Sequence, residues 1–132
     1  MFKHATKFLE RAAAVLLVLT GIFFSTSAQA AVELMMVEED GCIWCDRWDA
    51  EIGPIYPKTG AGKAAPLRRM DIRQPVPDDI EVARPLRFTP TFVLLIDGVE
   101  KGRIEGYPGE DFFWGLIERM LDQNGVVFED PT

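Results

Sequence analysis

The chain is 132 residues long and acidic, with a formal net charge of −7 that results from 14 lysine and arginine residues against 21 aspartate and glutamate residues. This balance argues against a nucleic-acid partner, because binding to phosphates requires an excess of basic side chains. The only histidine is His4, and the only cysteines are Cys42 and Cys45. Histidine-dependent catalytic triads and the usual histidine zinc sites are therefore excluded beyond the N-terminal segment.

Residues 1–30 have the pattern of a secretory signal peptide. Three basic side chains come before an apolar run at residues 12–24, and a small-residue Ala-Gln-Ala sequence follows at residues 28–30. The run is too short for a comfortable membrane span, which needs about 20 residues. We expect cleavage after residue 30, with an uncleaved membrane anchor as the alternative. Either outcome leaves residues 31–132, with a net charge of −9, as a single domain outside the cytoplasm.

The first part of this domain predicts a strand followed by a helix. Residues 32–37 are mostly apolar and precede an acidic turn, which is typical of a short buried strand. Bulky side chains then recur at spacings of four and three from Trp44 to Ile55, which predicts a helix that begins at the cysteine pair. Gly53 and Pro54 should end or bend this helix.

The middle of the chain predicts a loop, a second strand and a weak helix. Residues 58–65 are small, polar and rich in glycine, so we expect a loop there. A strand is expected at residues 67–72. Asp78 suits the N-cap of a short helix at residues 79–84, which Pro85 would not allow to continue.

The last part predicts a hairpin and a closing helix. Apolar runs at residues 92–96 and 99–104 flank an Asp-Gly pair, which is a strong hairpin signal. Helical spacing of large side chains follows at residues 112–121, and an Asn-Gly pair supplies the stop. The resulting order, βαβαββα, predicts an α/β domain in which one central mixed β-sheet is flanked on its faces by helices.

The C-x-x-C pair of Cys42 and Cys45 is compatible with several kinds of site. Structural zinc usually requires four cysteine or histidine ligands, and covalent haem attachment requires a histidine where this chain has Asp46. A structural disulfide remains open, although closing so small a loop stabilises a fold by only about 2 kcal/mol. The position of Cys42 at a helix N-terminus favours a redox role, because the helix dipole and free N–H groups stabilise a thiolate.

The predicted geometry assigns different roles to the two sulfurs. Cys42 should be the more exposed and attack a partner disulfide, and Cys45, one turn inward, should resolve the mixed disulfide. Negative charges nearby oppose the thiolate and make such a pair more reducing, so we expect an electron donor. An ordinary solvated acidic face is the alternative interpretation of these carboxylates. They are Glu38, Glu39, Asp40, Asp46 and Asp49.

The cysteine pair after a strand, the Thr-Pro-Thr sequence at residues 89–91 and the run at residues 102–107 resemble the thioredoxin superfamily. The resemblance covers about residues 32–121 and implies a thioredoxin-like fold for the domain at 31–132. It also implies a cis Thr89–Pro90 peptide bond, with Pro90 against the sulfurs and Thr89 offering backbone groups to a bound peptide.

A narrower resemblance comes from residues 48–53, 56–58 and 109–114, which look like the small periplasmic thioredoxin-like proteins of the SoxS type. It implies a periplasmic thiol-disulfide oxidoreductase that reduces the carrier protein of a sulfur oxidation complex. A membrane thiol-electron carrier would recharge it, and no cofactor beyond the redox-active disulfide would be needed. Two departures put a thioredoxin-like potential in doubt: Ile43 and Trp44 stand where thioredoxin has Gly-Pro, and Met36 replaces a buried aspartate.

Other functions remain open at this point. The pair could work as a periplasmic oxidase or isomerase, or be a redox-silent structural bridge. It could also handle Cu(I) without catalysis, together with Met35 or Met36. No phosphate-binding glycine loop or dinucleotide fingerprint indicates a small-molecule cofactor, and no metal site is expected.

Aromatic and basic side chains give weaker signals. Trp44 is a candidate partner contact, together with Trp48 and Phe92, although aromatic residues in such positions more often belong to the core. Four arginines could steer an acidic partner or simply form a solvated face. They are Arg68, Arg69, Arg84 and Arg87.

Overall fold

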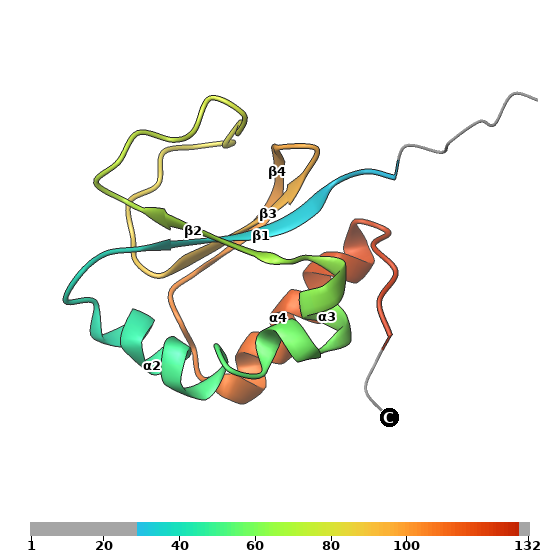
Figure 1. Ribbon diagram of the computed structural model, residues 1–132, viewed down its shortest axis with the longest axis horizontal. Helices are drawn as coiled ribbons and strands as arrows, with labels where there is room; N and C mark the ends of the chain where they lie inside the picture. The colour runs from blue at the N-terminus through green and yellow to red at the C-terminus, as the bar shows by residue number, and fades with distance from the viewer. Residues whose placement is uncertain (1–28, 130–132) are drawn as a thin grey trace, which may run out of the picture.

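The computed structural model describes residues 29–129, so almost all of the expected signal peptide at residues 1–30 lies outside the described part. A four-stranded mixed sheet forms the centre of the domain, in the order β2-β1-β3-β4 (Figure 1). β1 pairs in parallel with β2 and antiparallel with β3, and β3 pairs antiparallel with β4. The predicted mixed α/β sheet is confirmed. The strands are β1 (Val32–Glu38), β2 (Leu67–Asp71), β3 (Thr91–Ile96) and β4 (Val99–Glu105).

β1 is an inner strand that is buried on both faces, which explains its nearly continuous apolar sequence. Because successive side chains of a strand alternate, Leu34 and Met36 join the core on one face. Met35 and Val37 join a separate core on the other face. The strand therefore ties two hydrophobic clusters together, and its C-terminal end leads directly into the turn before Cys42.

All described helices lie on one face of the sheet (Figure 1). Trp48 of the first helix lies with its ring centroid 5.3 Å from that of Phe92 on β3 and 5.7 Å from that of Phe113 on the last helix. These three aromatic rings are fully buried. They fix both long helices against the sheet. The helical elements are α2 (Ile43–Glu51), the 3-10 turn η1 (Tyr56–Lys58), α3 (Gly60–Ala64) and α4 (Glu110–Gln123).

The prediction of a plain loop at residues 58–65 is wrong, because this segment contains the short helix α3. Thr59 caps it: its side chain accepts a hydrogen bond of 3.0 Å from the backbone N–H of Gly62. A Cβ atom at Gly62 would lie 1.8 Å from the carbonyl oxygen of Tyr56. Gly62, one of the glycines that suggested a loop, is thus needed for close packing of α3 against η1.

The predicted helix at residues 79–84 is also wrong. The segment is non-helical and crosses the sheet face opposite the helices, where Glu81 forms a parallel bridge with Val99. Ile80 packs into the second core, so a loop covers this face where a helix was expected (Figure 1). Prolines at 77 and 85 leave too few residues between them for a stable helix.

A buried ion pair holds this covering loop to β4. Arg103 and Glu100 form two short contacts, and their side chains are only 4% and 5% exposed. Glu100 also accepts a hydrogen bond of 2.7 Å from the Ala83 N–H, and Arg103 donates one of 2.9 Å to the Arg84 carbonyl. Burial acts to raise the pKa of Glu100, but the hydrogen bonds from Arg103 and Ala83 outweigh it and leave this pKa lowered.

The predicted hairpin and closing helix are confirmed. Asp97 and Gly98 both have positive φ, 52° and 77°, as the tight turn of a two-residue hairpin requires. α4 buries Phe113, Ile117, Met120 and Leu121 at helical spacing. It ends before Gly125, whose φ of 68° suits a glycine after a helix. No described helix is long and apolar enough to cross a membrane.

We expect Glu100→Gln to lower the free energy of unfolding by about 2 kcal/mol at neutral pH, because Arg103 would lose its two close charge-assisted contacts and keep only Glu105, at 3.5 Å, as a carboxylate partner. Urea denaturation followed by tryptophan fluorescence measures this loss. Since the folded pKa of Glu100 is lowered, the ion pair stabilises the fold above the unfolded pKa and is lost as the pH falls through the folded one. The difference between variant and parent should therefore shrink in acid.

The exposed Glu81 bridges the same strand and has no ion pair among the described residues, so Glu81→Gln is the matched control. It should change stability by less than about 0.5 kcal/mol. Equal effects of the two substitutions would contradict a stabilising role for the Arg103–Glu100 pair.

Candidate functional site

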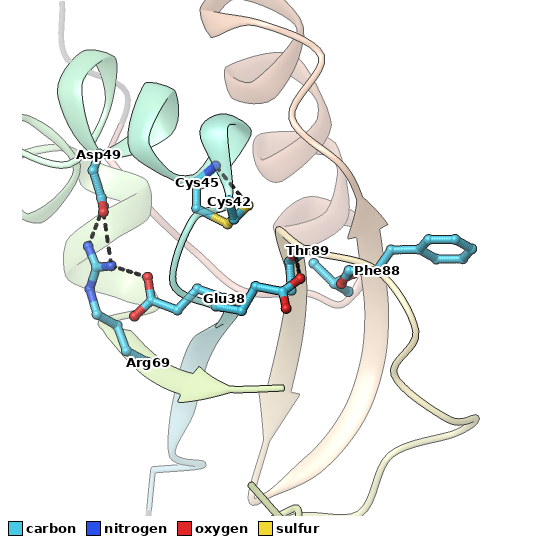
Figure 2. Close-up of a disulfide and its surroundings, with 9 residues drawn as sticks. Glu38, Cys42, Cys45, Asp49, Arg69, Phe88 and Thr89 are labelled. Atoms are coloured by element: carbon cyan, nitrogen blue, oxygen red, sulfur yellow. Dashed lines mark hydrogen bonds and ion pairs between the residues drawn. A yellow bond between two sulfur atoms is a disulfide. The ribbon is translucent and has the colours of Figure 1, made fainter. Parts of the chain in front are cut away.

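Cys42 and Cys45 form a disulfide at the N-terminus of α2 (Figure 2). Cys42 is the N-cap residue, and its Sγ accepts a hydrogen bond of 3.2 Å from the backbone N–H of Cys45. Cys42 is partly exposed, whereas Cys45 is buried. The expected asymmetry between an outer and an inner sulfur is present. A partner can reach Cys42 first, and the helix N-terminus offers it N–H groups that favour a thiolate.

A tight turn between β1 and α2 sets the position of the cysteine pair. The Cys42 N–H donates to the Glu39 carbonyl over 3.3 Å, and Gly41 between them has a φ of 81°. Residues other than glycine rarely adopt this backbone conformation. The chain therefore reverses within a few residues of the end of β1 and starts α2 with the sulfurs at the edge of the sheet.

The loop before β3 faces the same turn. The Thr89–Pro90 peptide bond is cis, as the resemblance implied, and Pro90 is buried. The Thr89 hydroxyl donates a hydrogen bond of 2.7 Å to Glu39, which links this loop to the turn before Cys42 (Figure 2). Within the described residues, neither the backbone N–H nor the carbonyl of Thr89 has a hydrogen-bond partner. Both groups are therefore available to an incoming chain.

A polar pocket of about 320 Å³ opens beside Cys45, and we call it the acidic pocket. All five carboxylates that the sequence placed near the cysteines line it. Asp71 on β2 adds a sixth, which sequence reasoning missed because β2 lies far from the cysteines along the chain and joins β1 only in the folded sheet. The lining is Glu38, Glu39, Asp40, Gly41, Cys45, Asp46, Asp49, Arg69 and Asp71.

Two arginines neutralise part of this pocket. Arg69 on β2 forms ion pairs with Glu38 and Asp49 (Figure 2). Its guanidinium lies 5.9 Å from the centroid of the Trp48 ring. Arg73 pairs with Asp40 and Asp71 at 3.2 and 2.8 Å.

Hydrogen bonds from Arg73 lower the pKa of Asp71, and the same contacts raise the pKa of Arg73. Six carboxylates against two guanidinium groups leave the acidic pocket with four net negative charges. Asp46 has no ion pair among the described residues.

The arginines considered as a basic surface are mostly engaged. Arg68 forms an ion pair of 2.7 Å with Asp79, and Arg84 forms one of 2.9 Å with Glu105. Arg69 belongs to the acidic pocket. Arg87 alone of the four has no ion pair within residues 29–129. The four arginines therefore do not form a free basic patch, because three of them are paired with carboxylates.

Exposed apolar side chains flank the disulfide. Ile43, Trp44 and Phe88 are 70%, 49% and 58% exposed. Of the three aromatic residues considered as partner contacts, Trp44 is at the surface, and Trp48 and Phe92 are core residues. Sequence reasoning missed Phe88, and its place directly before the Thr-Pro-Thr sequence was the available signal.

Trp44 contacts the first of three polar side chains that are linked to one another. The Arg47 guanidinium lies 5.8 Å from its ring centroid, and Arg47 pairs with Glu51 at 2.9 Å. Glu51 in turn accepts a hydrogen bond of 2.6 Å from the Tyr107 hydroxyl. The hydrogen bond from Tyr107 and the one from Arg47 lower the pKa of Glu51. Burial and the bond to Glu51 raise the pKa of Tyr107, so its hydroxyl stays protonated and donates.

The methionines considered as copper ligands are separated by the sheet. Met36 shares a core cluster with Cys45, whereas Met35 lies in the cluster on the opposite face. Met35 therefore cannot join the two sulfurs around one ion. In the part of the chain that the structure describes, no cluster of three or more histidine, cysteine or acidic side chains is arranged to hold a metal.

Comparison with solved structures gives a clear relative. The chain is 55% identical to the periplasmic thioredoxin SoxS from Paracoccus pantotrophus, whose crystal structure shows the reduced form. The match covers 98% of that chain and 70% of this one, with a TM-score of 0.69. A scan against protein-family models and a search of curated proteins gave no match.

We expect Asp46→Asn to raise the reduction potential of the cysteine pair by about 10 to 20 mV. Removing a negative charge beside the sulfurs favours the thiolate and so the reduced form. The size follows from about 0.5–1 kcal/mol, the upper part of the range for an exposed charge interaction, and about 30 mV per 1.4 kcal/mol. Equilibration with glutathione buffers measures it.

Asp111→Asn makes the same charge change in the first turn of α4 and serves as the control, with no shift expected. A lower or unchanged potential in Asp46→Asn would contradict electrostatic tuning of the sulfurs by the acidic pocket.

Proposed function

The chain belongs to the SoxS-type thioredoxins of the thioredoxin family and is a thiol-disulfide oxidoreductase, and we propose that it acts in the periplasm as the dedicated reductant of one partner protein. The observation that carries the proposal is the asymmetric pair at the start of α2. Cys42 is accessible at the helix N-terminus, and Cys45 is buried against the acidic pocket.

The exchange proceeds in two displacements. The thiolate of reduced Cys42 attacks one sulfur of the partner disulfide, the partner bond breaks, and its other sulfur leaves as a thiolate that takes a proton. Cys45 then loses its proton and attacks the Cys42 sulfur. The mixed disulfide breaks and releases the second partner thiolate. Two electrons pass to the partner, and the Cys42–Cys45 bond forms again.

The charge around the sulfurs supports the direction of electron flow. Four net negative charges in the acidic pocket oppose a strongly stabilised thiolate. A weakly stabilised thiolate makes the reduced pair less stable and so a better electron donor. An oxidase or isomerase would require the opposite bias.

The proposed partner is the carrier protein of a sulfur oxidation complex, held through an extended segment against Thr89 and Pro90. Support comes from the relative, a periplasmic thioredoxin named SoxS, and from the unpaired backbone groups of Thr89. A membrane thiol-electron carrier is the proposed source of electrons. Electrons enter and leave through the disulfide itself, so the proposal needs no small-molecule cofactor. The signal-like sequence at residues 1–30 supports export to the periplasm.

Cys45→Ser should trap the partner as a stable mixed disulfide on Cys42, because the resolving sulfur is missing. Non-reducing electrophoresis of a periplasmic extract, followed by mass spectrometry, identifies the trapped protein. Cys42→Ser is the matched control and should trap little, since the buried Cys45 cannot reach a partner. Equal trapping by both variants would contradict the assigned roles.

The reduction potential separates the reductant from its alternatives. We expect a value near or below about −250 mV against glutathione, followed by the fluorescence of the nearby Trp44 and Trp48. A value near about −120 mV would instead identify an oxidant. If the cysteine pair does not exchange with glutathione at all, the remaining candidate functions are a structural bridge and a Cu(I)-handling protein.

A further inference from the structure

We propose that three polar side chains are positioning residues of the reductase, because they connect the half-exposed ring of Trp44 to the core and hold it in place for contact with the partner. They are Arg47, Glu51 and Tyr107. This inference rests on the proposed reductase function and adds the residues that prepare the contact surface beside the disulfide.

Trp44 is the residue that needs such support. It lies in the first turn of α2, between the two cysteines. Its side chain is 49% exposed, and within residues 29–129 it belongs to neither core cluster. An exposed side chain on a helix changes rotamers freely and loses entropy when a partner immobilises it. Contacts that fix the ring before binding therefore favour the complex.

The first of these contacts comes from the same face of α2. Trp44, Arg47 and Glu51 follow one another at spacings of three and four, so their side chains are neighbours on the helix surface. The Arg47 guanidinium lies 5.8 Å from the centroid of the Trp44 ring, which is a cation–π distance. Its Nε donates a hydrogen bond of 2.9 Å to Oε1 of Glu51. Arg47 thus has a partner on each side, the ring and the carboxylate.

Tyr107 anchors this row of side chains to the core. An exposed ion pair on a helix orders its side chains only weakly by itself. Here Oε2 of Glu51 also accepts a hydrogen bond of 2.6 Å from the Tyr107 hydroxyl. Tyr107 is only 6% exposed, and its ring centroid lies 6.1 Å from that of Phe113 in the main core cluster. Glu51 therefore cannot turn away from Arg47 without breaking its bond to a core residue.

The loop that carries Tyr107 also contacts the cis-proline loop. The backbone N–H of Gly106, the residue before Tyr107, donates a hydrogen bond of 2.7 Å to the Pro90 carbonyl. One loop is thus bonded to the cis-proline loop and, through the three polar side chains, to the Trp44 ring. A partner that uses both contacts meets them at a fixed spacing.

The first test is fluorine NMR of the oxidised protein labelled with fluorotryptophan, in which Trp44→Phe assigns the Trp44 signal among the three tryptophans. Tyr107→Phe removes only a hydroxyl, and we expect it to move the Trp44 signal toward that of a tryptophan in a short peptide. Tyr56→Phe is the matched control, because it removes the other tyrosine hydroxyl of the same core cluster, which donates to the Ala65 carbonyl over 2.7 Å. It should leave the Trp44 signal unchanged.

The second test compares two disulfides that release the same chromogenic thiol when the reduced protein attacks them. One carries mercaptoethanol and reaches only the sulfurs, and the other carries an alanine-rich peptide with a single cysteine. The ratio of their second-order rate constants, peptide over mercaptoethanol, cancels any change in the reactivity of Cys42. Tyr107→Phe should lower this ratio about threefold, and Tyr56→Phe should not change it.

Combined variants separate positioning from a general loss of stability. Trp44→Ala should lower the ratio about fivefold, and adding Tyr107→Phe should lower it no further if Tyr107 acts through the ring. Arg47→Gln changes a side chain that is 53% exposed, so it tests the same link without disturbing the core. It should reproduce the effects of Tyr107→Phe on the fluorine signal and on the ratio.

Each outcome decides the inference. An unchanged Trp44 signal in Tyr107→Phe, or equal shifts in Tyr107→Phe and Tyr56→Phe, would overturn it and leave the reductase function in place. A shifted signal with an unchanged ratio, or additive effects of Trp44→Ala and Tyr107→Phe, would overturn it as well. If the parent protein reduces neither disulfide, the proposed function fails and the inference fails with it.

Discussion

The contact of Trp48 with Phe92 and Phe113 is the interaction on which the site depends. Trp48 lies one helical turn after Cys45, and its buried ring packs between β3 and α4. This packing fixes α2 against the sheet and sets the position of both sulfurs at the end of β1. Aromatic burial of this size contributes several kcal/mol. The redox chemistry therefore takes place at the exposed end of a helix whose other side is part of the core.

The charge of the surrounding carboxylates distinguishes this site from that of thioredoxin. Thioredoxin has a buried aspartate near its cysteines, whereas this chain has Met36 and a group of carboxylates that face solvent. Arg69 and Arg73 come from β2 and the turn after it, and they hold four of those carboxylates in place. The remaining charge opposes a strongly stabilised thiolate, which is the physical basis of the proposed electron donation.

The two errors in predicting the fold have a common cause, which is local composition overruled by long-range contacts. The glycines at residues 60 and 62 suggested a loop, but tertiary packing uses their small size to bring α3 against Tyr56 and the chain near Glu129. Residues 79–84 have a helix-like start, but Arg103 and Glu100 bind their backbone and hold the segment across the sheet. The contacts with Glu129, Glu100 and Arg103 join residues far apart in sequence, whereas the Thr59 cap and the prolines at 77 and 85 were local signals that the composition outweighed.

The sequence by itself determined the strands, the hairpin, both long helices and the identity of the two reactive sulfurs, because hydrophobic periodicity, turn residues and the C-x-x-C spacing act over a few neighbouring positions. Only the tertiary structure decided that a loop covers the second face of the sheet and that Asp71 joins the acidic pocket. It also decided which carboxylates are neutralised and that Phe88 lies across the disulfide from them. These features arise where β1, β2 and the loop before β3 meet. Because their residues come from three segments far apart in sequence, no fixed spacing along the chain predicts that they lie together.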